Sequence, residues 1–141
     1  MRFRTETHIA STPETVWRHL TVPELMERWM AGAELLRTKD GGALHDGTEL
    51  LFITRNNEQR SRVVSFEPRT LLGIRSTQGP FTATYHYRLT PNGTGVHLAL
   101  EAECTASGLA RFAMPVIGLL IKMSDGGQPK AIKEQVESDG D

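Results

Sequence analysis

The sequence predicts an α+β fold in which a curved seven-stranded antiparallel sheet wraps around a long C-terminal helix, with two short helices after the first strand. Three observations predict it. Polar and apolar residues alternate over residues 2–10, which is the period of a half-buried strand. Short apolar runs separated by turn residues fill residues 33–105. Apolar residues then recur every three or four positions over residues 107–136, which is the period of a helix facing a core.

The two short helices are indicated by start signals that follow the first strand. Thr12 is a suitable N-cap, and Pro13 suits the first helical position because it has no N–H to leave unpaired. Pro23 repeats the signal, and the apolar residues that follow it, ending in Trp29, have helical spacing. Gly32 is expected to end the second helix.

Six further strands are expected, each bounded by a turn signal such as Gly, Asn or Asp. They lie near residues 33–38, 48–55, 59–67, 70–77, 81–90 and 95–105. Consecutive strands joined by tight turns pair antiparallel. A sheet with one apolar face needs a cover, and the terminal helix is the only predicted element large enough to supply it.

The clearest strand register comes from Asn92-Gly93, which is a strong signal for a two-residue hairpin turn. A turn centred on this pair predicts the following opposed residues: Leu89 with Val96, Tyr87 with Leu98, Tyr85 with Leu100, and Ala83 with Ala102. These side chains form an apolar face with two phenols, which is expected to look toward the terminal helix. The opposite face is polar and carries His86 and His97, so we interpret these histidines as solvated rather than as metal ligands.

The terminal helix is expected over residues 107–136. Pro115 is expected to kink or restart it, and a break is expected near residues 125–129, which contain two glycines and a proline. Ile117 and Ile121 are expected to cover the two short helices, with a dimer contact or a membrane-facing patch as alternatives. The predicted inward stripe consists of Leu109, Phe112, Val116, Leu120 and Met123.

The bulk composition limits the classes of function. The chain has 141 residues, and we expect one domain over residues 1–137 with a frayed acidic tail at 138–141. Sixteen Lys and Arg against 17 Asp and Glu give a net charge of −1, without the basic excess typical of a nucleic-acid binder. The single cysteine, Cys104, cannot form an internal disulfide or a Cys-based zinc site. The sequence contains no signal-peptide or membrane-spanning run, so we expect a soluble cytoplasmic protein.

Four segments of the chain carry a family resemblance: the first strand running into Ser11–Trp17, the segment Leu25–Trp29, Phe66-Glu67-Pro68 followed by Leu71-Leu72, and the final hairpin leading into an amphipathic helix. Together they resemble the START-like (SRPBCC) superfamily, and within it the polyketide cyclase/dehydrase and lipid-transport family. The resemblance covers residues 1–137 and implies a helix-grip fold with a cavity between the sheet and the terminal helix. Family members hold lipids, aromatic polyketides, hormones or other bulky apolar molecules there, and some catalyse cyclisation or dehydration.

The candidate site residues share an expected inward position. Tyr85 and Tyr87 are the catalytic candidates on the apolar face, because a phenol can hydrogen-bond a carbonyl or donate a proton to an enolate; ordinary core tyrosines are the alternative. Arg62 is the third, since an inward guanidinium can polarise a carbonyl, although a solvated position is expected for it. The resemblance places Trp29 at the pocket wall or mouth, with a core anchor as the alternative. The predicted ligand-binding residues are Trp29, Leu50, Phe52, Tyr85, Tyr87, Leu98, Leu100, Phe112, Val116 and Leu120.

Three functions stay open at this level. The first is binding of a bulky hydrophobic small molecule, such as a lipid or an aromatic polyketide, in the cavity and without cofactor or metal. The second is a polyketide cyclase or dehydratase acting on a poly-β-keto or aromatic intermediate, in which Tyr85, Tyr87 or Arg62 polarises a carbonyl. The third is an interaction protein whose apolar helix docks on a partner or membrane. No nucleic-acid partner is expected, and the protein is expected to be a monomer or a weak homodimer.

Overall fold

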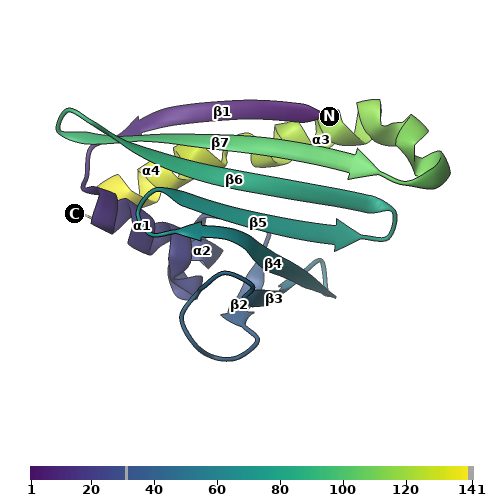
Figure 1. Ribbon diagram of the computed structural model, residues 1–141, viewed down its shortest axis with the longest axis horizontal. Helices are drawn as coiled ribbons and strands as arrows, with labels where there is room; N and C mark the ends of the chain where they lie inside the picture. Colours follow the sequence, from purple (N-terminus) through teal and green to yellow (C-terminus); the bar gives the residue numbers. More distant parts are fainter. Residues whose placement is uncertain (31, 140–141) are drawn as a thin grey trace.

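A computed structural model of the chain describes residues 1–30 and 32–139. Its elements, in chain order, are β1 (Arg2–Ile9), α1 (Pro13–Thr21), α2 (Pro23–Trp29), β2 (Glu34–Thr38), β3 (Glu49–Thr54), β4 (Asn57–Glu67), β5 (Leu71–Gln78), β6 (Phe81–Asn92), β7 (Gly95–Ala106), the 3₁₀ helix η1 (Gly108–Ala113), α3 (Met114–Asp125) and α4 (Gln128–Ser138). Figure 1 shows α1, α2 and α4 gathered toward one end of the molecule, with α3 extending toward the other end beside the N-terminus.

The seven strands form one antiparallel sheet in the order β1-β7-β6-β5-β4-β3-β2. Only β1 leaves the chain order, because it pairs with β7 and so joins the start of the chain to the last hairpin. The core lies between this sheet and the helices, where Leu20 of α1 and Ile132 and Val136 of α4 are completely buried. The predicted fold class, a curved seven-stranded sheet with two short helices after the first strand and a helical C-terminus, is confirmed.

The predicted register of the last hairpin is wrong by two residues, although its faces are right. Leu89 pairs with Leu98, Tyr87 with Leu100, Tyr85 with Ala102 and Ala83 with Cys104. The turn lies between the paired residues Asn92 and Gly95, and Gly93 has a φ of 65°. Gly93 therefore takes the first central position of the turn, where a positive φ suits a type II′ turn, rather than the second position of an Asn-Gly type I′ turn. A shift of two residues leaves every side chain on its predicted face.

The predicted inward stripe of the terminal helix is also wrong. Phe112, Val116 and Leu120 are 71, 65 and 56% exposed, and Leu109 and Met123 are exposed as well. The residues of α3 that turn toward the sheet are instead Met114, Ile117, Gly118 and Ile121. The physical reason is that α3 is apolar on both faces, so that helical periodicity alone does not identify its inner one. Gly118 lies on the inner face, where its missing side chain leaves room for the sulfur of Met1.

The helical C-terminus consists of three pieces. A 3₁₀ turn precedes α3, α3 begins at Met114 with Pro115 in its first turn, and α4 begins at Gln128 after the pair Gly126-Gly127. The restart at Pro115 and the break near residues 125–129 thus lie where the sequence predicted them. Among the helices of residues 1–30 and 32–139, none combines the length and apolar character needed to cross a membrane.

The end of α4 is joined to α1 and α2 by a buried histidine. His19 of α1 is completely buried, and its Nδ1 and Nε2 lie 2.9 Å from Thr15 O and 2.8 Å from Asp139 Oδ2. Arg28 of α2 also donates to Asp139 Oδ2, at 3.3 Å. Of the four tail residues expected to fray, Ser138 therefore belongs to α4 and Asp139 is bonded, while residues 140–141 lie outside the described residues.

The Asp139 contact is expected to make folding stability depend on pH at the acid end. The hydrogen bond from His19, with the charge of Arg28, holds the pKa of Asp139 below its usual value of 3.8. A depressed carboxyl pKa adds stability above the unfolded-state value, and that stability is lost as the pH falls through the folded-state value. Urea unfolding should show Asp139→Asn less stable than the wild-type protein at neutral pH, with the difference shrinking to nothing below the folded-state pKa. Parallel stability curves down to acid pH would contradict this.

Candidate functional site

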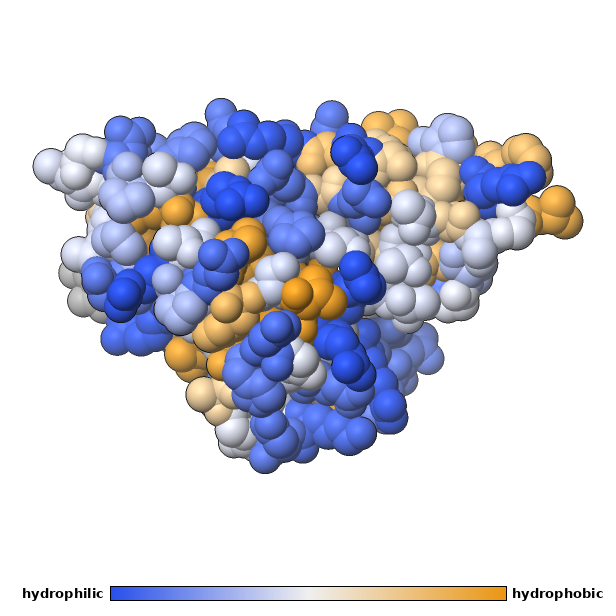
Figure 2. Space-filling model, in the orientation of Figure 1, coloured by the Kyte–Doolittle hydropathy of each residue, from blue (hydrophilic) through white to orange (hydrophobic). Residues whose placement is uncertain are grey.

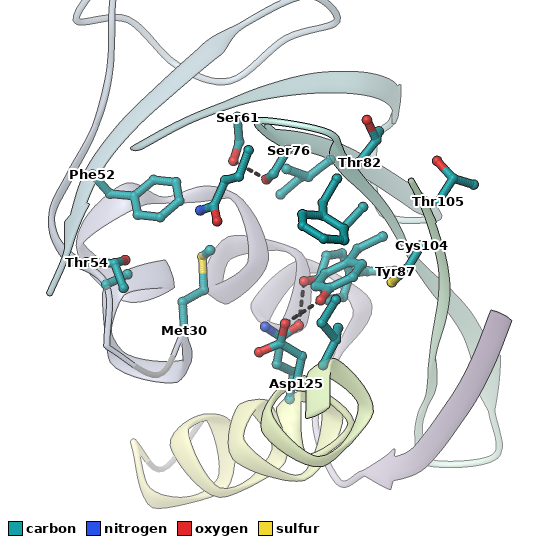
Figure 3. A pocket seen from close by; sticks show the side chains of 18 of the residues that line it. Met30, Phe52, Thr54, Ser61, Ser76, Thr82, Tyr87, Cys104, Thr105 and Asp125 are labelled. Atoms are coloured by element: carbon teal, nitrogen blue, oxygen red, sulfur yellow. Dashed lines mark hydrogen bonds between the residues drawn. The ribbon is translucent and has the colours of Figure 1, made fainter. Parts of the chain in front are cut away.

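A cavity of about 260 Å³ lies between the concave face of the sheet and the helices. Strands β3 to β7 supply one wall, and the start and end of α3, the start of α4 and Met30 at the end of α2 supply the other. Figure 3 shows Phe52 and Met30 on one side of this space and Cys104 and Tyr87 on another. Alternation along β6 turns Ala83, Tyr85 and Tyr87 toward this space.

One end of the cavity is polar, and both tyrosines of β6 contribute to it. Tyr85 donates a hydrogen bond to Asp125 Oδ2, and Tyr87 donates one to Gln128 Oε1 at 2.6 Å. Asp125 is the last residue of α3 and Gln128 the first of α4, so the break at Gly126-Gly127 places both at this end. Figure 3 shows the Asp125 side chain rising from the helix toward the phenols.

The two phenols are held in their protonated form. Burial, followed by the charge of the Asp125 carboxylate, raises the pKa of Tyr85 and of Tyr87 well above the usual value of 10. At neutral pH both groups therefore act as hydrogen-bond donors and not as phenolate bases. A pKa so far from neutrality also makes them poor proton donors, since general acids work best with a pKa near the working pH.

The rest of the lining combines apolar side chains with polar ones from strands β3 to β7, which are Thr54, Ser61, Ser76, Gln78, Thr82 and Thr105. The apolar part includes Phe52, Ile74, Phe81, Met114 and Ile121. Across the cavity from Asp125, Ser61 and Ser76 bond each other through their hydroxyls at 2.5 Å (Figure 3). In this pair one hydroxyl donates to the other, whereas Asp125 offers a charged acceptor, so the end at Asp125 and Gln128 is the better place to hold a polar group of a guest molecule.

The structure brings three of the predicted site residues together on the cavity wall, namely Phe52, Tyr85 and Tyr87. Leu50, Leu98 and Leu100 are completely buried and belong to the packed core, outside the cavity lining.

Trp29 also packs as a core anchor. It is 2% exposed, its Nε1 donates to His19 O at 2.8 Å, and its ring meets Tyr87 edge-on at 5.4 Å between centroids.

The other candidates lie on the outside. Phe112, Val116 and Leu120 occupy the outer face of the helical C-terminus and point away from the cavity. Arg62 lies on the outer face of β4, where its Nη2 bonds Glu49 Oε1 at 2.9 Å and its side chain is 60% exposed. Arg62 therefore has the solvent-exposed position that the sequence predicted. Its guanidinium does not line the cavity.

Sequence reasoning missed Asp125 and Gln128, the two groups that make the cavity polar at one end. The predicted helix break at residues 125–129 was the available signal for these two residues. Polar side chains on either side of such a break can turn toward the sheet. Sequence reasoning also missed Met114 and Ile121, since they occupy the face of α3 that helical periodicity assigned to the outside.

The curved sheet, the broken terminal helix and the cavity between them define a helix-grip protein. The chain belongs to the polyketide cyclase/dehydrase and lipid transport family, whose family model matches residues 1–134. No curated protein matches the chain.

Several solved structures share this fold at low sequence identity. Protein MLL2253 from Mesorhizobium loti superimposes with a TM-score of 0.73 at 22% identity, covering 100% of this chain and 99% of that one. TTHA0849 from Thermus thermophilus gives a TM-score of 0.74 at 15% identity and covers both chains fully, at 100% each. Ara h 8.0201 gives 0.72 at 15% identity, covering 98% of each chain. At such identities these likenesses establish the fold and leave the ligand to be argued from the site.

Proposed function

We propose that the protein binds a compact apolar molecule that carries one polar group, with that group held by Asp125 and Gln128. The observation that supports this is that the Asp125 carboxylate and the Gln128 amide lie at one end of a cavity whose exposed lining is mainly apolar. Ligand pockets combine apolar walls with a few convergent polar groups that fix orientation.

The chemistry of the polar end selects the kind of polar group. The Asp125 carboxylate is an acceptor, and one of its oxygens receives the Tyr85 bond. The Gln128 amide uses its oxygen for Tyr87, so its two N–H donors are not engaged by that bond. A guest hydroxyl can donate to the carboxylate and accept from the amide, which makes a hydroxylated apolar molecule the best match.

The size of the cavity favours a small guest. Its volume of about 260 Å³ lies just below the usual range of about 300–1,000 Å³ for ligand pockets. One fused ring pair or a short branched chain suits this space better than a folded poly-β-keto chain.

Binding of 2-naphthol and naphthalene tests the proposal, because the two probes differ by one hydroxyl. A hydrogen bond to a charged group contributes about 1.5–3 kcal/mol, so 2-naphthol should bind about tenfold to hundredfold more tightly, measured by calorimetry. Asp125→Asn keeps the shape but removes the charge, and should reduce this preference to severalfold. Asp46→Asn, an exposed carboxylate outside the cavity lining, is the matched control and should leave it intact. Equal affinity for both probes, or no binding of either, would contradict the proposal.

A second candidate function is cofactor-free cyclisation or dehydration of a small carbonyl compound. It is favoured by the inward-facing pair of the Tyr85 phenol and the Asp125 carboxylate. The phenol, kept protonated by its raised pKa, would have to turn its single O–H from Asp125 to the enolate oxygen in order to stabilise the negative charge there. Binding ranks first because the same raised pKa weakens proton transfer from Tyr85. Turnover of a carbonyl substrate that falls at least about tenfold in Tyr85→Phe would favour catalysis instead.

A further inference from the structure

The outer face of η1 and α3 is apolar and exposed. Here "the outer face" means six side chains that are 53–85% exposed: Leu109, Phe112, Val116, Leu119, Leu120 and Met123. Figure 2 shows hydrophobic colouring over this end of the molecule, around α3. The opposite face of α3 packs on the body of the protein through Ile117 and Ile121. A helix that is apolar on both faces is normally covered on both, and a contiguous exposed patch of this kind marks an interaction surface.

The charged residues within the segment that carries the outer face are both positive. Arg111 and Lys122 are exposed, and the segment from Ser107 to Ser124 contains no carboxylate. Arg111 places its guanidinium 5.2 Å from the centre of the Phe112 ring, so a cation and an aromatic side chain lie together. Asp125, the next acid along the chain, is bonded to Tyr85 at the cavity.

We propose that the outer face docks on the surface of an anionic lipid bilayer. Apolar side chains such as Leu119 and Met123 enter the boundary between headgroups and acyl chains, and Arg111 and Lys122 contact the headgroup phosphates. The charge pattern favours a bilayer over a second copy of the chain. A two-fold contact would bring each cation close to the cations of the other copy, with no carboxylate from this segment between them.

Docking on a bilayer gives the cavity a route to apolar guests. Met114 and Ile121 line the cavity from the inner face of α3, while the outer face of the same helix meets the lipid. The helix is therefore the wall that separates the cavity from the membrane surface. The proposal does not depend on which molecule the cavity holds.

Flotation with vesicles of phosphatidylcholine alone, and of phosphatidylcholine with 30% phosphatidylglycerol, tests the docking. The protein is expected to float with the anionic vesicles. Removing both cations in Arg111→Gln/Lys122→Gln should weaken binding about 25-fold, because each basic residue near an anionic surface contributes about fivefold. Leu119→Gln/Met123→Gln should weaken it at least about a hundredfold, since two large apolar side chains no longer leave water. The matched control is Leu35→Asn, which removes a 63% exposed leucine on β2 at the far edge of the sheet and should change nothing.

Two results would overturn the proposal. One is equal flotation of the wild-type protein and both double variants, or no flotation of any of them. The other is a dimer in solution, seen by light scattering, that Leu119→Gln/Met123→Gln dissociates, because a second copy would then be the occupant. Measuring 2-naphthol affinity without vesicles keeps this test separate from the cavity, since both double variants should bind the probe like the wild-type protein.

Discussion

Replacing Leu98 with alanine is expected to lower the free energy of unfolding by about 2–5 kcal/mol. Leu98 of β7 is completely buried and lies between Thr7 of β1 and Leu89 of β6. Removing its branched end leaves a void that the flanking strands cannot close, because hydrogen bonds to both neighbours hold them at a fixed spacing. Urea or thermal unfolding measures the loss.

The same substitution separates a core position from a ligand-contacting one. Because Leu98 lies outside the cavity lining, Leu98→Ala should change the affinity for 2-naphthol little at a temperature where the variant is folded. Leu35→Ala, at an exposed leucine, is the control and should cost less than about 0.5 kcal/mol. The contrary outcome is that Leu98→Ala loses less than about 0.5 kcal/mol of unfolding free energy and clearly loses affinity for 2-naphthol. That result would place Leu98 on the wall of the binding cavity.

Filling the cavity from β6 is expected to block binding without harming the fold. The side chain of Ala83 lines the cavity, and Ala83→Leu adds three carbons to a space of about 260 Å³. A probe that loses contact with even two methylene equivalents loses about 1.6 kcal/mol. The affinity for 2-naphthol should therefore fall at least about tenfold. Unfolding should show equal or higher stability, since filling a cavity removes a void.

The control for this substitution is Thr90→Leu. Thr90 lies on the same strand but on the exposed outer face of the sheet, so the same leucine there should leave 2-naphthol affinity unchanged. Wild-type affinity in Ala83→Leu, together with wild-type stability, would mean that the probe binds somewhere other than the cavity.

The faces of the sheet were largely predictable because side chains along a strand alternate between its two faces. Alternation assigns each residue to a face whatever the register, so Tyr85 and Tyr87 were expected on the apolar face even though their partners were misassigned by two positions. The error came from the conformation of the turn at Gly93, which the dipeptide Asn92-Gly93 does not determine by itself.

The helical side of the cavity was less predictable. On α3 either face has enough apolar residues to pack, so the inner face is set by how the helix lies on the sheet, with Gly118 against Met1, a residue far away in sequence. The polar end depends on two further long-range contacts, Tyr85 with Asp125 and Tyr87 with Gln128. The local sequence pattern predicted the break between α3 and α4. The hydrogen bonds from Tyr85 and Tyr87 span about 40 residues of sequence, and they depend on how the helices lie on the sheet.

Contacts between bound 2-naphthol and the side chains of the protein test the central claim most directly, because the cavity and the outer face of α3 present different methyl groups. Nuclear Overhauser measurements on methyl-labelled protein are expected to connect the probe to Ile74, Met114 and Ile121, which line the cavity. Contacts confined to Leu119 and Met123 would show binding on the outer face only, and together with silent cavity methyls they would contradict an internal binding site.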